Sequence, residues 1–174
     1  MATKSGPEWY EWQGDTEHFV LYRHKEWYPL DGTVQLQDAF LHFIEEIHTM
    51  MCHDFPKFQI QKGQKIEVRI RPGSAICNSP YRISLPYAYG MTALHELLHA
   101  AFRRAKLFEG QDTYESVMVD DFVEHKAMKH FYFRKIQWKY FKKHPIKFFF
   151  WFNDVYLTKK LDKQYDYREW MVVI

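Results

Sequence analysis

Residues 92–101 read Thr-Ala-Leu-His-Glu-Leu-Leu-His-Ala-Ala and carry the strongest chemical signal in the chain. His95 and His99 are four positions apart, so on a helix their imidazoles lie on one face, one turn apart. Two imidazoles placed in this way can converge on one tetrahedral metal ion. Glu96, next to the first histidine, can reach a water molecule held by that ion. The spacing therefore predicts a zinc site with an adjacent general base.

The residues around this motif favour a packed helix. An apolar stripe at helical spacing is formed by Leu94, Leu97, Leu98 and Ala101. Thr92, which follows Gly90 and Met91, is a suitable N-cap. A buried helix that carries two histidines and a glutamate needs partners for these groups, because burying them unpaired is costly. A metal ion is one such partner. An ordinary amphipathic helix with a hydrogen-bonded His-Glu-His face is the alternative.

The segment resembles the active-site helix of the zincin metallopeptidases, including the threonine three residues before the first histidine. This resemblance implies one Zn²⁺ per chain, a protein or peptide substrate, and hydrolysis of a peptide bond with Glu96 as the general base. It covers the motif helix closely and residues 65–130 loosely.

A third zinc ligand must come from farther along the chain, because a catalytic zinc site takes three protein ligands. The metzincin pattern needs Gly at 102 and His at 105, where this chain has Phe102 and Ala105. Arg103 excludes a histidine one turn after His99. Glu124 lies 25 residues after His99 on the next predicted helix, a separation that resembles the gluzincin arrangement.

The surroundings of Glu124 resemble the E-x-x-A pattern of several gluzincin families, since residues 124–127 read Glu-His-Lys-Ala. Those families often have Asp or Asn next, where this chain has Met128. Asp121 is then the candidate for the carboxylate that orients a ligand. The alternative third ligands are Asp120, Asp121, His125 and His130, and the candidate donors to the oxyanion of the reaction are Tyr87, Tyr89, His125 and His130.

Hydrophobic periodicity predicts one α+β domain over residues 1–174, with a small antiparallel or mixed sheet and helices on one face. Strands are expected at 17–23, 66–70 and within 75–85, and helices at 34–52, 92–106 and 113–142. Residues 1–16 are expected as a tail or a packed extension. Pro80 and Pro86 bound the segment 79–85 and indicate an edge strand. In the zincin resemblance, an edge strand before the motif helix binds extended substrate by backbone pairing.

Composition sets limits on the class of protein. Hydrophobic residues make up 47% of the chain and the net charge is only +2, which indicates a globular protein and gives no whole-chain argument for nucleic acid. Cys52 and Cys77 form no disulfide framework, so reduced thiols are expected. No signal peptide or membrane-spanning segment is recognised, and a cytoplasmic protein that does not bind membranes is predicted. The oligomeric state is not determined by the sequence.

Two other functions are consistent with the sequence. The first is a non-catalytic binding module stabilised by zinc. The second is a nucleic-acid binder that uses the basic aromatic segment 126–147. The intact Glu96 favours catalysis, because a purely structural zinc site needs no general base. The lysines of 126–147 are also consistent with the solvated face of an amphipathic helix. SprT-like zincins, some of which cleave proteins on DNA, use a third histidine that this chain lacks at the expected place.

Overall fold

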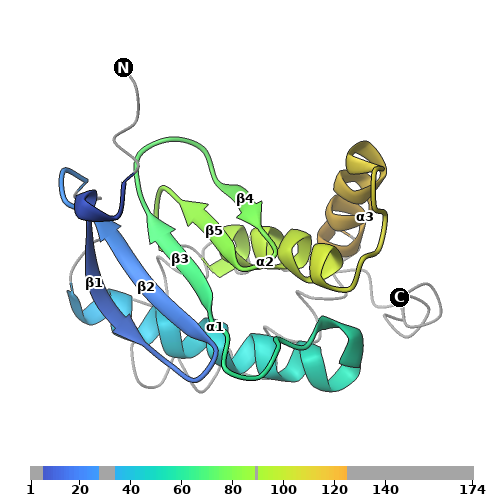
Figure 1. The fold of residues 1–174 in the computed structure, drawn as a ribbon, viewed down its shortest axis with the longest axis horizontal. Helices are drawn as coiled ribbons and strands as arrows, with labels where there is room; N and C mark the ends of the chain where they lie inside the picture. Colours follow the sequence, from blue (N-terminus) through green and yellow to red (C-terminus); the bar gives the residue numbers. More distant parts are fainter. Residues whose placement is uncertain (1–5, 28–33, 89, 125–174) are drawn as a thin grey trace.

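The computed structural model describes residues 6–27, 34–88 and 90–124, with the backbone alone at 34–39, 54, 90–91 and 121–124. This part of the chain is α+β, as predicted (Figure 1). Its elements are, in chain order, η1 (Pro7–Trp9), β1 (Tyr10–Asp15), β2 (Phe19–His24), α1 (Val34–Asp54), η2 (Pro56–Phe58), β3 (Ile66–Ile70), β4 (Ile76–Ser79), β5 (Arg82–Leu85), α2 (Gly90–Arg104) and α3 (Asp112–Glu124).

The strands form one mixed, five-stranded sheet in the order β1-β2-β3-β5-β4. The three central strands, β2, β3 and β5, run parallel to one another, and α1 makes the crossover from β2 to β3. Both edge strands, β1 and β4, run antiparallel to the strand beside them. Leu21 pairs with Val68, and Val68 pairs with Ile83, so one row of apolar side chains crosses the centre of the sheet.

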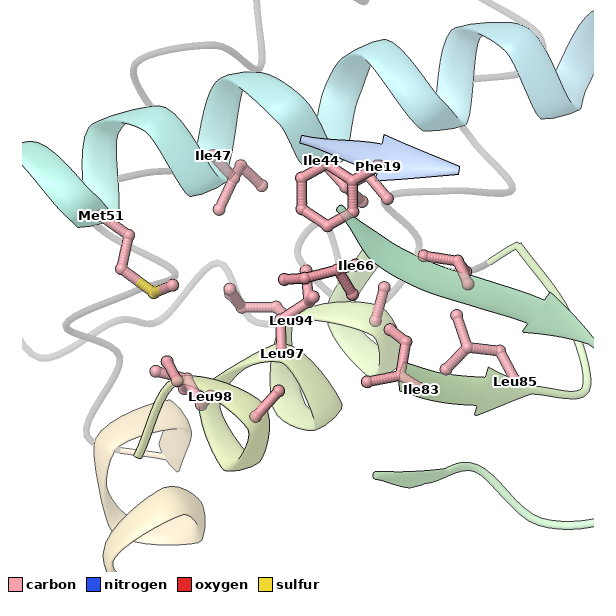
Figure 2. Close-up of a cluster of buried hydrophobic side chains, with 14 of the residues drawn as sticks. Phe19, Ile44, Ile47, Met51, Ile66, Ile83, Leu85, Leu94, Leu97 and Leu98 are labelled. Atoms are coloured by element: carbon pink, nitrogen blue, oxygen red, sulfur yellow. The ribbon is translucent and has the colours of Figure 1, made fainter. Parts of the chain in front are cut away.

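One face of the sheet is covered by α1 and α2, and the core lies between them (Figure 2). The inward side chains of the strands alternate with outward ones, as the period of two requires. They meet the apolar faces of the two helices in one continuous cluster whose labelled members are Phe19, Ile44, Ile47, Met51, Ile66, Ile83, Leu85, Leu94, Leu97 and Leu98. Burying one such side chain stabilises the fold by about 1.5–3 kcal/mol. The apolar stripe predicted for the motif helix is therefore confirmed.

Three local predictions are corrected by the structure. Tyr10–Asp15, expected to belong to a tail or a packed extension, form edge strand β1. Thr92 is not an N-cap, because α2 already begins at Gly90. The segment 79–85 is not the edge strand, because β5 inserts between β3 and β4. The prolines that suggested an edge lie instead at the two ends of β5, where they remove no ladder hydrogen bond.

Both cysteines are buried free thiols, in agreement with the prediction of reduced cysteines. Within the described residues, the helices lack the combination of length and apolar content that crossing a membrane would require.

The connection from α2 to α3 sets how the two helices meet. Leu107 N–H donates to Phe102 O at 2.9 Å, and Lys106 N–H donates to Arg103 O at 3.1 Å. These two bonds are the Schellman pattern, which ends a helix with a left-handed residue. Lys106 occupies that left-handed position with φ 55°, where glycine is usually found. The chain therefore turns sharply after α2 and brings α3 back against it.

Replacing Lys106 by glycine should stabilise the protein. The left-handed conformation costs an L-residue about 1–2 kcal/mol, and the greater freedom of unfolded glycine offsets part of the gain. We expect Lys106→Gly to raise the free energy of unfolding by about 0.5–1 kcal/mol in urea titrations. Gly110→Ala is the matched control. Gly110 has φ 73° and open space around an added Cβ, so this change should lower stability through the backbone alone. Lower stability in Lys106→Gly would contradict the assignment of Lys106 to the left-handed position of the Schellman pattern.

Candidate metal and catalytic site

The two motif histidines lie side by side on α2. Their ring centroids are 5.0 Å apart and the rings are inclined by 66°. His99 is buried and His95 is half-buried, so the site opens toward His95. The predicted helix thus brings both imidazoles to one face, as their spacing requires.

Helix α3 places a carboxylate next to the Nδ1 atom of each histidine. Glu115 Oε1 lies 2.7 Å from His99 Nδ1, and Asp120 Oδ1 lies 3.5 Å from His95 Nδ1. The glutamate is also 3.2 Å from the guanidinium of Arg103, so it is the negative partner of an ion pair. Because a carboxylate only accepts hydrogen bonds, His99 donates its Nδ1–H to Glu115, and in the neutral form of this ring the lone pair then lies on Nε2. Metal-binding histidines are oriented in the same way by carboxylates.

Glu96 on α2 is buried, with 7% of its surface exposed. Burial raises the pKa of its carboxyl group. The effect is partly offset by His99, by a hydrogen bond from the backbone amide of Cys77, and by Arg103. A raised pKa brings a carboxylate closer to the range in which a general base works near neutral pH. The environment of Glu96 therefore suits the role that its position in the motif predicts.

His95 is favoured in its neutral form. Burial lowers its pKa, the neighbouring His99 lowers it further, and the nearby Asp120 acts in the opposite direction. A neutral imidazole is the form that binds a metal ion.

The structure describes only some of the other predicted site residues. Asp120 lies on α3 next to His95. Glu124 is the last residue of α3, one turn after Asp120, and is described by its backbone alone, as is Asp121. Tyr87 packs against Trp27, with ring centroids 6.3 Å apart. Three predicted residues and the basic segment lie outside the described residues, namely Tyr89, His125, His130 and 126–147.

Sequence reasoning missed two residues that the structure brings into the site, Glu115 and Arg103. Arg103 lies one turn after His99, so the series His95, His99, Arg103 follows one helix face. That series was available in the sequence. The partnership of Glu115 with both His99 and Arg103 depends on how α3 returns against α2, which no local pattern contains.

A second group of side chains, of types that can bind a metal ion, is held together by hydrogen bonds. Within the described residues, the ligand atoms of Glu17, His18 and Glu45 gather within 4.8 Å. Glu45 accepts from Thr16 Oγ1 at 3.1 Å and from the backbone N–H of His18 at 3.3 Å, and it lies 2.7 Å from His18 Nδ1. Its carboxylate thus ties the turn between β1 and β2 to α1. This group could hold a metal ion, but the bonds of Glu45 already account for it structurally.

A pocket of about 330 Å³ lies beside this turn, between α1 and η2. Its lining includes His18, His48, Cys52 and His53. His48 lies 3.4 Å from Arg104 Nη2 through its Nε2, so the guanidinium occupies the lone pair that a metal would need. Burial, Arg104 and His18 together lower the pKa of His48 to about 3, and burial raises the pKa of Cys52 to about 11. The pocket therefore pairs a neutral imidazole with a thiol and is a poor cation site.

The chain matches no model of a known protein family, no curated protein sequence and no solved structure. The interpretation of the site therefore depends on its own geometry.

His48 should make the fold sensitive to acid. Its pKa is about 3 when folded and about 6.5 when unfolded, so the unfolded chain binds a proton first. The contribution of His48 to stability is present above about pH 6.5 and is lost as the pH falls toward 3. Urea unfolding of the wild type and of His48→Gln at pH 7.5 and 4.5 tests this.

The loss of stability between the two pH values should be smaller in His48→Gln, even if the variant is less stable at pH 7.5. Thr49→Ala alters the same pocket without removing a titrating group, so it should keep the wild-type pH dependence. An unchanged pH dependence in His48→Gln would contradict the prediction.

Proposed function

We propose that this chain is a zinc-dependent metallopeptidase of the gluzincin-like type, which hydrolyses peptide bonds with Glu96 as the general base. One observation carries the proposal most strongly. Two histidines one helical turn apart each have a carboxylate of α3 at Nδ1, and a buried glutamate with a raised pKa lies next to them. This arrangement provides ligands, their orienting groups and a base in one place.

The donor set suits zinc. Histidine nitrogen and carboxylate oxygen are common ligands in catalytic zinc sites, which combine three protein ligands with one open position. His95 and His99 would supply Nε2 atoms, and Glu124 would be the third ligand. Asp120, one turn before Glu124, already faces His95, so that helical spacing puts Glu124 on the same side of α3. Asp120 would then orient His95 as Glu115 orients His99.

The protein residues have separate roles in the proposed reaction. Bound zinc would acidify a water molecule and polarise the substrate carbonyl. Glu96 would take the proton of that water and transfer it to the leaving amine. The amide of Cys77 would hold the carboxylate of Glu96 in place before the proton is transferred. Burial of Glu96 would keep its proton affinity high enough for the first step.

The fold is consistent with the zincin resemblance. The motif helix packs under an edge strand that runs antiparallel to its neighbour, in a mixed sheet. We infer that β4, rather than the segment 79–85, is the strand along which an extended peptide would bind. Backbone groups at the outer side of an edge strand can make such pairing, and on β4 these would be groups other than the carbonyl of Cys77, which already accepts from Arg103.

Zinc content of the purified protein tests the ligand assignment. The wild type should contain about one zinc per chain by plasma mass spectrometry, and His95→Ala, His99→Ala and Glu124→Ala should lose it, because each variant removes one of three ligands. Zinc retained in Glu124→Ala but lost in Asp120→Ala would move the third ligand to Asp120. An absence of zinc in the wild type after reconstitution would contradict the proposal.

Glu96→Gln separates catalysis from structure. This change keeps the size of the side chain and removes its basicity. We expect zinc content to stay at the wild-type level, while cleavage of an unfolded protein substrate falls by about 10²- to 10⁴-fold.

Glu109→Gln, which changes an exposed carboxylate in the connection after α2, should leave cleavage unchanged. Zinc binding without any cleavage by the wild type would instead favour the non-catalytic, zinc-stabilised binding module.

A further inference from the structure

We propose that Arg103 is a positioning residue, which holds edge strand β4 and helix α3 in register with the two motif residues His99 and Glu96. The inference rests on the proposed zinc function, since it concerns how the ligand and the base of that site are oriented. Its hydrogen bonds within the described part of the chain go to Glu115 and Cys77, and not to His95 or His99 directly.

The first contact of Arg103 leads to His99. Arg103 Nε donates to Glu115 Oε1 at 3.2 Å, and the same oxygen accepts from His99 Nδ1 at 2.7 Å. Glu115 is almost fully buried, so its carboxylate has few other orientations in which to find partners. The ion pair therefore fixes the oxygen that receives the Nδ1–H of His99, and with it the direction of Nε2.

The second contact of Arg103 leads to Glu96 through the edge strand. Arg103 Nη1 donates to Cys77 O at 2.9 Å. The amide of the same residue lies close enough to the carboxylate of Glu96 to lower the pKa of that group. Cys77, which pairs with Ile83 of β5, is therefore also held to α2 through its carbonyl, and its amide lies at the carboxylate of Glu96. The position of the donor to Glu96 consequently depends on the arginine that holds the neighbouring carbonyl.

A guanidinium is needed to make both contacts at once. Its planar fork presents several N–H donors in fixed directions, so one side chain can bond to a carboxylate and a carbonyl on two different elements. Lysine carries its charge at a single nitrogen and cannot reproduce this geometry. One residue thus connects β4, α2 and α3 at the site.

The next residue provides a matched control. Arg104 also lies in the last turn of α2 and also binds backbone carbonyls, of Phe58 at 2.9 Å and of Pro80 at 2.9 Å. Its other partners among the described residues include His48, in the pocket between α1 and η2, and the ring of Tyr81, whose centroid lies 5.8 Å from the guanidinium. A loss of Arg104 should therefore disturb packing, while a loss of Arg103 should disturb the site.

The first experiment compares zinc affinity with the stability of the metal-free protein in Arg103→Gln and Arg104→Gln. Zinc affinity is measured by competition with a chelator, and stability by urea unfolding. Removing a group that orients a metal ligand typically weakens binding by about 10- to 100-fold, and we expect this loss in Arg103→Gln. Arg104→Gln should lower the stability of the metal-free protein and keep zinc affinity within about threefold of the wild type, because none of its contacts leads to the ligands.

The second experiment reads the orientation of His99 without metal. Long-range ¹H–¹⁵N spectra of the metal-free protein report which ring nitrogen carries the proton. The wild type should carry it on Nδ1, and Arg103→Lys, Arg103→Gln and Glu115→Gln should each increase the share carried on Nε2. The zinc affinities of Arg103→Gln, Glu115→Gln and the double variant should be non-additive, since both residues act on His99 through one contact.

The outcomes separate this inference from the proposed function. If the wild type binds zinc through His95 and His99, but Arg103→Gln keeps the wild-type affinity and the wild-type tautomer of His99, the positioning role is wrong and the metallopeptidase proposal stands. If the wild type binds no zinc, both fail. If Arg103→Gln and Arg104→Gln lose zinc affinity equally, in proportion to their lost stability, Arg103 has only a structural role.

Discussion

Burial of α2 is the constraint on which the rest of the site depends. This helix packs against the sheet, α1 and α3, so two of its polar residues, Glu96 and His99, have little access to water. Glu96 and His99 must then find protein partners, because unpaired buried polar groups are strongly destabilising. The partners are the amide of Cys77 on β4 and the carboxylate of Glu115 on α3. The partners that Glu96 and His99 require thus bring α2, β4 and α3 together at the site.

The two arginines at the end of α2, Arg103 and Arg104, show how the same side-chain type takes different roles. In one place, Arg104 meets the imidazole of His48 directly, and in the other, Arg103 meets the carboxylate that receives the imidazole proton of His99. The direct contact occupies the lone pair of His48 and, together with burial, keeps that ring neutral without leaving it free to bind a cation. The intervening carboxylate accepts the Nδ1–H of His99, so in the neutral ring the lone pair lies on Nε2. One acidic residue between arginine and histidine therefore distinguishes the packing histidine, His48, from the predicted ligand, His99.

The sheet contributes to the candidate site through the order of its strands rather than through their side chains. Because β5 pairs between β3 and β4, the strand that precedes it along the chain is left at the edge, next to α2. The carbonyl of Cys77 on this strand can then accept from Arg103 of the helix instead of from a further strand, and its amide lies at the carboxylate of Glu96. An edge strand normally leaves such groups open to other chains. Here, part of the edge is used to hold the predicted base.

Local patterns in the sequence determined a large part of this protein. The alternation of residues 66–70 predicted β3 with its observed bounds, and the spacing of apolar residues predicted α1 and the buried stripe of α2. The His-Glu-His face also followed from the sequence, since the positions of side chains along one helix depend only on its period. A metallopeptidase function remains a proposal drawn from that face.

The tertiary structure alone decided which strand lies at the edge and which carboxylates meet the histidines. Pro80 and Pro86 are compatible with an edge strand or with the two ends of an internal one, and only the pairing of β5 with both neighbours distinguishes these cases. Glu115 is an ordinary acidic residue in the first turn of a helix until the Schellman turn at Lys106 returns α3 against α2. Contacts between elements arise from long-range packing, which the period of a single element does not contain.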